Sequence, residues 1–490
     1  MSDDELKNMT LEFKGRYENG ESLDRLLPEA FAAMCEADKR VLGMYPFDVQ
    51  IMAGIALHRG YLCEMNTGEG KTLTATLPMY LNGLTGKSTI LVTNNEYLAL
   101  RDTEEMGPAY RFMGLSIAAG VKRDEDDKFG NDEKRDIYAH DIVYTTHSAL
   151  GFDYLINNLV KSAKERFMRD FNYIIIDEAD SVLLDSASTP LVISGAPRVQ
   201  SNLYESADFF VRTLQENVDY EIEEKNVWFT EKGLEYAESY FGVDNIFDPD
   251  YFEIYRHLVL ALRAHKIIEK GTEYIISEQG EVALIDASSG RMLKGVKLRG
   301  GQHQAIECKE KVKITQENRS MASVTYQNFF SMFPNMAGMS GTIYDAKDEL
   351  FDVYGKKVVV IPPNRPIKRI DCKDWYFSDS KKQFEAAIKL AMKKHEKGQP
   401  VLIVTTMIAD TEIISHLLVK EGVPHSVLNA NNAFWEADII KEAGQWGAMT
   451  VATSMAGRGT DIKLGDGVKD LGGLAVIGVG RMQNIRDERQ

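Results

Sequence analysis

Residues 65–72, Met-Asn-Thr-Gly-Glu-Gly-Lys-Thr, lie between an apolar stretch at 60–65 and a helix-like stretch at 73–84. Gly68 and Gly70 allow the backbone to turn so that several of its N–H groups face the same point. The helix that follows adds its positive N-terminal end, where an anion is stabilised. The stretch therefore predicts a strand–loop–helix unit that holds phosphate.

The last two residues of this loop predict what it holds. Lys71 can reach the β- and γ-phosphates of a nucleotide, and the Thr72 hydroxyl can ligate Mg²⁺. The usual pattern begins with a glycine, and Met65 stands in its place. A glycine-containing loop that merely precedes a helix thus stays open as an alternative on this stretch alone.

A second acidic motif supports the nucleotide interpretation. Residues 177–180 are Asp-Glu-Ala-Asp, and they follow the apolar run 173–177. Asp177 at the end of such a strand would hold Mg²⁺ through its waters, and Glu178 can accept a proton from an attacking water. The alternative is an acidic cap on a helix. Together with the phosphate loop, the motif predicts an ATPase that uses ATP and Mg²⁺.

Gln50 precedes the phosphate loop in the stretch Pro-Phe-Asp-Val-Gln. Its amide can both donate to and accept from the edge of an adenine ring, which would favour ATP over GTP. A surface glutamine without a ligand is the alternative.

The apolar pattern predicts the fold around these motifs. Residues 24–42 have apolar side chains at helical spacing, and residues 89–93, 141–145 and 173–177 are short, continuously apolar runs. Runs of this kind are strands buried on both faces, which implies a parallel sheet covered by helices. Ligands of such sheets bind at the carboxyl ends of the strands.

A second α/β unit is predicted late in the chain. Residues 401–405 and 450–453 are again short apolar strands, with helical patterns at 381–394 and 410–421. Between the two units, residues 362–366 are Pro-Pro-Asn-Arg-Pro. This stretch is too rich in proline for a helix or a central strand, so we expect an interdomain linker.

Residues 452–461 of this second unit, Ala-Thr-Ser-Met-Ala-Gly-Arg-Gly-Thr-Asp, follow its last predicted strand. The two glycines around Arg458 allow close approach of the backbone. We expect Arg458 and Asp461 to project into a cleft between the lobes, where such groups sense whether the cleft is closed. A Gly-Arg-Gly turn without function is the alternative.

Between 195 and about 313 the pattern changes. Residues 221–228 and 273–285 resemble β-hairpins, and 234–240 and 251–268 resemble helices. We expect a separate α+β domain, inserted into the first lobe. The aromatic residues of this segment suit a surface that binds unfolded polypeptide, and about half of them are expected in its own core instead.

Composition narrows the function classes. The chain has 57 basic and 74 acidic residues, a formal charge of −17, which disfavours nucleic acid as a partner. The apolar runs fall short of the ~20 residues of a membrane span, and the acidic N-terminus does not resemble a signal peptide. The four cysteines are scattered, so we expect no zinc site. The expected location is the cytoplasm.

Beyond single motifs, the sequence resembles SecA, the ATPase that drives preproteins through the bacterial SecY channel. The most specific stretch is 189–195, Thr-Pro-Leu-Val-Ile-Ser-Gly, after the acidic motif. The resemblance runs almost end to end, through residues 65–76, 97–102, 150–155, 177–195, 302–311, 326–330, 337–342, 427–430 and 452–464.

The resemblance implies an α/β fold of the P-loop NTPase, superfamily 2 helicase-like kind. It implies two RecA-like parallel-sheet lobes with an inserted α+β preprotein-crosslinking domain. The expected domains are a first lobe (1–195 with 313–361), the inserted domain (196–312), the linker (362–366) and a C-terminally incomplete second lobe (367–490).

The resemblance also assigns site residues. Asp177 and Glu178 match the family's Mg²⁺ and water pair, and Arg458 matches its second-lobe arginine. Thr72 and Asp177 are the implied Mg²⁺ ligands. The implied nucleotide contacts are Gln50, Gly68, Glu69, Gly70, Lys71, Thr72 and Asp461.

Implied partners are unfolded preprotein and a SecY-type channel, with the chain in the cytoplasm and peripherally associated with the inner face of the membrane. Residues 478–482 and 485–490 are more similar to the accessory, second SecA of Gram-positive bacteria. That form exports specialised cargo, often glycosylated adhesins, and works with accessory Sec proteins. A homodimer stays open.

The sequence departs from the family pattern in three places. Ala179 replaces the usual valine of the acidic motif, family members have further residues ahead of 5–13, and the chain stops before the last helicase motif. We therefore expect ATP to be bound better than it is hydrolysed. Two alternatives stay open, namely a nucleic-acid helicase of the DEAD type and a nucleotide-binding fragment without turnover.

Overall fold

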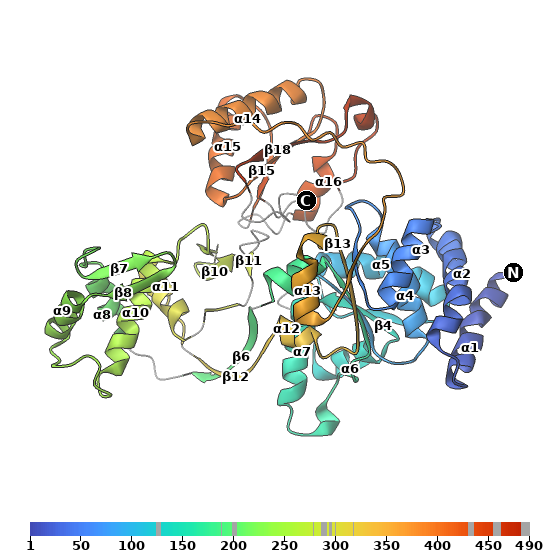
Figure 1. Ribbon diagram of the computed structural model, residues 1–490, viewed down its shortest axis with the longest axis horizontal. Coiled ribbons are helices and arrows are strands. Elements are labelled where there is room, and N and C mark those ends of the chain that lie inside the picture. Colours follow the sequence, from blue (N-terminus) through green and yellow to red (C-terminus); the bar gives the residue numbers. More distant parts are fainter. Residues whose placement is uncertain are drawn as a thin grey trace.

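Three bodies make up the molecule in the computed structural model, a first lobe, a second lobe and a smaller unit reached from the first lobe through two long strands (Figure 1). The structure describes residues 1–123, 129–187, 189–197, 203–277, 279–285, 292–293, 296–298, 300–316, 318–429, 436–453 and 462–481.

A seven-stranded sheet forms the centre of the first lobe, in the order β14-β1-β13-β5-β2-β4-β3. Every neighbouring pair is parallel. The strands are β1 (Leu62–Glu64), β2 (Thr89–Thr93), β3 (Ile117–Ala119), β4 (Ile142–Thr146), β5 (Tyr173–Asp177), β13 (Asn335–Ser340) and β14 (Val358–Val360). The strands predicted at 89–93 and 173–177 are confirmed, and the one predicted at 141–145 lies one residue later.

The sheet is buried on both faces, as the continuous apolar runs predict. Along β5, Tyr173 and Ile175 belong to one hydrophobic core, and Ile174 and Ile176 belong to the other. The first core also contains α1 (Asp3–Glu18), α2 (Leu23–Leu42), α3 (Asp48–His58), α4 (Lys71–Gly83) and α5 (Glu96–Phe112). The second contains α6 (Asn131–Ala139), α7 (His147–Leu159), α12 (Tyr326–Phe330) and α13 (Lys347–Tyr354).

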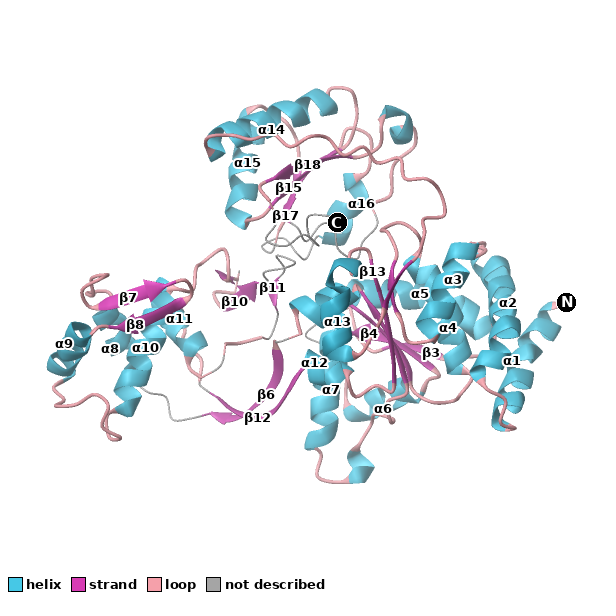
Figure 2. Ribbon diagram, viewed as in Figure 1, coloured by secondary structure: helices cyan, strands magenta, loops and turns pink. Residues whose placement is uncertain are grey.

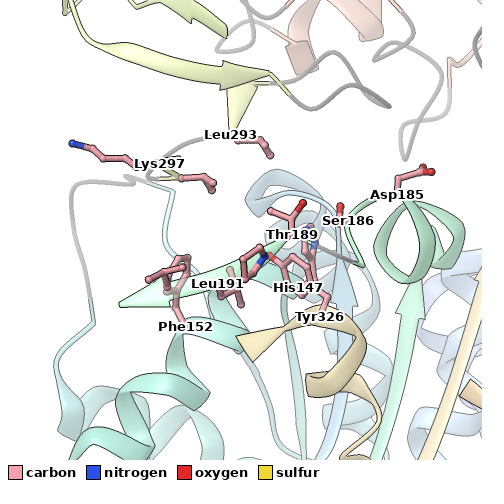
Figure 3. A pocket seen from close by; sticks show the side chains of 12 residues that line it. His147, Phe152, Asp185, Ser186, Thr189, Leu191, Leu293, Lys297 and Tyr326 are labelled. Carbon is pink, nitrogen blue, oxygen red and sulfur yellow. The ribbon is translucent and has the colours of Figure 1, made fainter. Parts of the chain in front are cut away.

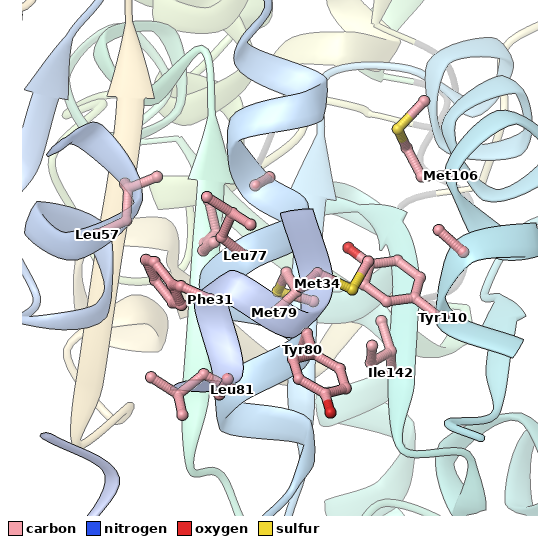
Figure 4. Close-up of a cluster of buried hydrophobic side chains, with 14 of the residues drawn as sticks. Phe31, Met34, Leu57, Leu77, Met79, Tyr80, Leu81, Met106, Tyr110 and Ile142 are labelled. Atoms are coloured by element: carbon pink, nitrogen blue, oxygen red, sulfur yellow. The ribbon is translucent and has the colours of Figure 1, made fainter. Parts of the chain in front are cut away.

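Helix α4 is the most enclosed element of the first core. All of its residues from Leu73 to Gly83 are buried. Figure 4 shows Leu77, Met79 and Tyr80 of α4 among side chains from α2 and α5. The helix that begins at Lys71 is thus held on several sides, and this packing fixes its N-terminal end.

A pair of antiparallel strands, β6 (Pro190–Pro197) and β12 (Asn318–Thr325), leads out of the first lobe and back. The described residues between them, 203–316, are called the insert below. The predicted boundary at residue 195 lies inside β6. Figure 2 shows the insert's helices packed beside its short strands.

The insert contains two small sheets. The hairpin predicted at 221–228 is confirmed as antiparallel β7 (Tyr220–Glu223) and β8 (Asn226–Phe229). The second sheet comprises β9 (Tyr274–Ile276), β10 (Val282–Ile285) and β11 (Met292–Leu293). The helices are α8 (Leu203–Val211), α9 (Glu231–Phe241), α10 (Phe252–Lys266) and α11 (Gln302–Lys309).

The second lobe has a four-stranded parallel sheet in the order β16-β17-β15-β18. Its strands are β15 (Val401–Thr405), β16 (Ser426–Leu428), β17 (Met449–Thr453) and β18 (Ala475–Val479), and its helices are α14 (Ser380–His395), α15 (Ile408–Lys420) and α16 (Glu436–Ala443). Residues 361–379, which join the lobes, contain neither helix nor strand. Among the helices of the described residues, none has the length and apolar character needed to cross a bilayer.

Candidate functional site

The predicted phosphate loop lies where β1 ends and α4 begins, at the carboxyl edge of the first sheet. Gly68 and Gly70 have φ angles of 83° and 79°, a left-handed conformation that glycine adopts without strain. A Cβ on Gly70 would lie 2.3 Å from the Gln50 Nε2 atom, so a side chain at this position would displace the Gln50 amide. Both glycines therefore serve the shape of the loop.

Lys71 and Glu178 meet across this edge, although 107 residues separate them in the chain. The Lys71 Nζ atom donates to the Glu178 Oε1 atom at 2.5 Å, and both side chains are largely buried. Burial acts to lower the pKa of Lys71, but the carboxylates of Glu178 and Asp177 outweigh it and raise that pKa above its usual value. The lysine stays charged at neutral pH.

Asp177 is buried at the end of β5 beside this pair. Burial raises the pKa of Asp177, and the Lys71 ammonium offsets part of that rise. Its Oδ1 atom has no hydrogen-bond partner among the described residues. A buried carboxylate oxygen without a donor suits a hard cation. Asp177 therefore fits Mg²⁺, and Thr72 lies in the first turn of α4, beside Lys71.

Glu178 has a strained backbone. Its φ is 50°, a left-handed conformation that residues other than glycine rarely adopt. Strain of this kind costs about 1–3 kcal/mol and gathers at functional sites. The position thus fits the catalytic role predicted for Glu178.

Asp180 has a role that the sequence did not indicate. It accepts hydrogen bonds from the Ser340 Oγ atom at 2.6 Å and the Thr342 Oγ1 atom at 2.7 Å. Ser340 ends β13, so the acidic motif is bonded to the turn after the neighbouring strand. The Ser-Gly-Thr sequence at 340–342 was the available signal.

Two glutamates of the β1–loop segment accept hydrogen bonds from distant backbone N–H groups, one in the first lobe and one in the linker. The Glu64 Oε2 atom accepts from the Tyr344 backbone N–H at 2.6 Å. The Glu69 Oε2 atom accepts from the Asn364 backbone N–H at 3.1 Å. The sequence predicted Glu69 as a nucleotide contact of the loop, did not indicate its bond to Asn364, and gave no role to Glu64.

Gln50 is buried against the phosphate loop. Its Nε2 atom donates to the Glu69 carbonyl at 2.9 Å and to the Gly70 carbonyl at 3.3 Å. Its Oε1 atom accepts from the Phe47 backbone N–H at 2.8 Å. Gln50 therefore braces the loop, and its contact with adenine stays a prediction.

The predicted residues of the second lobe, Arg458 and Asp461, lie outside the described residues. Strand β17, which precedes them, ends at Thr453 on the carboxyl edge of the second sheet.

A pocket lies apart from these residues, between the first lobe and the insert. Figure 3 shows Leu293 and Lys297 of the insert on the opposite side of this pocket from His147, Leu191 and Tyr326 of the first lobe. Its lining is mixed. The apolar side chains of Phe152, Pro190, Val192 and Val296 and the polar ones of Asp185, Ser186 and Thr189 complete it.

Comparison with known proteins identifies two matching family models. The SecA DEAD-like domain matches residues 1–351, and the SecA P-loop domain matches residues 366–470. The protein translocase subunit SecA 2 of Streptococcus gordonii is 53% identical over 100% of this chain and 62% of its own length.

Similar proteins occur in other species. The SecA 2 subunit of Streptococcus agalactiae (strain NEM316) is 52% identical, and that of Staphylococcus haemolyticus is 49% identical. Both are matched over 100% of this chain and 62% of their own length. The chain thus spans about three fifths of the curated relatives it matches.

Proposed function

Because this chain belongs to the SecA family, we propose that it is the ATP-driven motor of a protein translocase. It would couple ATP hydrolysis to the movement of preproteins through a SecY-type channel. The observation that carries this proposal is the meeting of Lys71 and Glu178 at the carboxyl edge of the first sheet, beside Asp177.

The proposed roles follow from chemistry and position. The N–H groups of residues 68–72 and the Lys71 ammonium bind the phosphates of ATP. Thr72 and Asp177 hold Mg²⁺, which screens the charge of the phosphates. Glu178 accepts a proton from the attacking water. Gln50 contacts adenine in addition to bracing the loop.

The ion pair of Lys71 and Glu178 suggests how the site responds to nucleotide. The two side chains neutralise each other at 2.5 Å. The phosphates of ATP would compete for the Lys71 ammonium and leave Glu178 free to act on water. Arg458 and Asp461 are proposed to approach the same nucleotide from the second lobe.

Proposed partners are unfolded preprotein, a SecY-type channel and accessory Sec proteins, at the cytoplasmic face of the membrane. The similarity to SecA 2 subunits supports a specialised cargo such as glycosylated adhesins. The pocket between the first lobe and the insert, with its mixed polar and apolar lining, is a place where an unfolded chain could bind.

The test is the rate of ATP hydrolysis with an unfolded secretory precursor and SecY-containing vesicles, compared with RNA. We expect stimulation by the precursor and none by RNA. Stimulation by RNA alone would favour a helicase. Tight ATP binding without turnover under every condition would favour a nucleotide-binding fragment.

A further inference from the structure

The phosphate loop and the linker into the second lobe start side by side. Strands β1 and β14 are parallel neighbours, with Glu64 opposite Val360. The Ile361 N–H donates to the Glu64 carbonyl at 2.9 Å, which extends the pairing beyond β14. Beyond these residues, β1 continues into the phosphate loop, and β14 continues into the linker to the second lobe.

One side chain spans the gap between these two segments. The Glu69 carboxylate, at the centre of the phosphate loop, accepts the Asn364 backbone N–H at 3.1 Å. A hydrogen bond to a carboxylate is stronger than one between neutral groups. The contact links residues 295 positions apart.

Because of the linker's composition, few of its backbone groups can donate such a hydrogen bond. Three of the residues at 362–366 are prolines, which have no N–H, so Asn364 and Arg365 carry its only backbone donors. Proline also stiffens the segment, because its ring fixes φ. A stiff linker that is held at one point has a defined direction where it leaves the first lobe.

We propose that the Glu69 carboxylate is a positioning residue that couples the phosphate loop to the linker, and through it to the second lobe. The inference rests on the proposed ATPase function. A nucleotide that orders the phosphate loop thereby also fixes the position of the first residues of the linker to the second lobe. Glu69 acts here through its side chain, whereas the loop binds phosphate through its backbone N–H groups.

The contact itself is tested without nucleotide by amide hydrogen exchange of a peptide covering 359–366. Glu69→Ala should accelerate exchange of the Asn364 amide, and Glu69→Gln, which still accepts a hydrogen bond, should slow it again. Glu18→Ala, at the exposed end of α1, is the matched control. Equal exchange in the wild type and Glu69→Ala would overturn the proposal, whatever the chain does with ATP.

The coupling is tested with ATP. Alanine keeps the backbone N–H of residue 69, so we expect the Kd for ATP to stay within about threefold of the wild type. Single-turnover hydrolysis should fall about five- to tenfold, in the range of typical coupling energies. Glu69→Gln should restore most of this loss. An equal loss of binding and hydrolysis in Glu69→Ala would make Glu69 a simple nucleotide ligand.

Cys372 offers a probe of the linker. It is the exposed cysteine, whereas Cys35, Cys63 and Cys308 are buried. A fluorescent label on Cys372 should change its emission on addition of a non-hydrolysable ATP analogue in the wild type and Glu69→Gln, and not in Glu69→Ala. An unchanged response in Glu69→Ala would contradict the coupling. Absence of nucleotide binding in the wild type would instead contradict the proposed function, and the exchange experiment would still decide the contact.

Discussion

Glu178 combines a left-handed backbone, φ 50°, with a 2.5 Å contact to the Lys71 ammonium. A strained residue persists only where its surroundings hold it, and here the buried lysine and the end of β5 do so. The same carboxylate is the proposed base for water. Whether the Glu178 carboxylate is free to accept a proton from water therefore depends on what else binds Lys71.

Replacing Lys71 by alanine should abolish useful ATP binding. The variant loses the charge partner of the phosphates, and truncating one partner of a buried charge pair costs about 2–5 kcal/mol, so we expect at least a 30-fold weaker Kd. Calorimetry measures the affinity, and circular dichroism checks the fold. Lys87→Ala, on an exposed loop, is the control. A folded Lys71→Ala protein with near-normal affinity would refute the assignment of the loop.

Replacing Glu178 by glutamine should keep ATP bound and block its hydrolysis. The amide has the shape of the carboxylate but cannot take a proton from water, a role worth ~10²–10⁴ in rate. The amide also cannot form an ion pair with Lys71, so ATP should bind at least as tightly as to the wild type. Single-turnover hydrolysis at saturating ATP is the measurement. Substantial turnover would assign the base to another residue.

At the scale of elements, α4 begins at the end of the phosphate loop and packs against α2. The Thr76 hydroxyl lies 2.8 Å from the Asp38 Oδ2 atom and 2.7 Å from the Leu73 carbonyl. A hydroxyl has one proton, so it cannot donate to both. A neutral Asp38 that donates to Thr76 satisfies both contacts. Burial raises the pKa of Asp38 to about 7, in agreement with a neutral carboxyl.

Asp38 should therefore make the stability of the first lobe depend on pH. Its pKa is about 4 in an unfolded chain and about 7 here, so the folded state alone keeps the proton between these values. Stability falls as pH rises through this window, by about 1.4 kcal/mol for each pKa unit. Asp38→Asn should remove this pH dependence of the free energy of unfolding. Urea unfolding of both proteins at pH 5 and pH 8 is the measurement.

Between pH 5 and pH 8, the free energy of unfolding of Asp38→Asn should rise relative to that of the wild type by on the order of 3 kcal/mol. Thr76→Val, which loses the acceptor, should be destabilised at both pH values. Parallel pH profiles for the wild type and Asp38→Asn would show that Asp38 is charged in the folded protein.

The sequence predicted the central strands because β2 and β5 are continuously apolar and buried on both faces. It did not predict β13, whose residues Asn-Met-Ala-Gly-Met-Ser have no β-branched side chain. This strand owes its place to pairing with β1 and β5, which sequence periodicity does not contain.

The candidate site likewise combines features that local sequence indicates with features that depend on distant segments. The phosphate loop and acidic motif are local patterns, and the sequence contained them. The bonds from Asp180 to Ser340 and from Glu69 to Asn364 join distant segments. They depend on which segments are neighbours in the fold. The Ser-Gly-Thr sequence at 340–342 was a local signal for the first bond, and no local pattern indicated the second.

At the scale of the whole molecule, the aromatic residues of the insert include both buried and exposed side chains. Tyr204, Phe210 and Tyr220 are buried in its cores. Phe209, Trp228 and Tyr251 are exposed by 64%, 41% and 38%. These exposed aromatic side chains and the pocket beside Leu293, whose lining is partly apolar, are the surfaces that suit an unfolded polypeptide, which offers apolar side chains without a fold of its own.

The last prediction is that unfolded polypeptide contacts the insert in preference to the first lobe's outer helices. A photo-crosslinking residue at Leu293, in the pocket, or at Phe209, on the exposed face of α8, should label an unfolded secretory precursor. The control position is Leu11 on α1, which is 70% exposed and therefore tests exposure alone. An excess of RNA should leave the labelling unchanged, because the chain's charge of −17 disfavours polyanions. Equal labelling from Leu11 would show that the insert has no preference for polypeptide, and competition by RNA would favour a nucleic-acid partner.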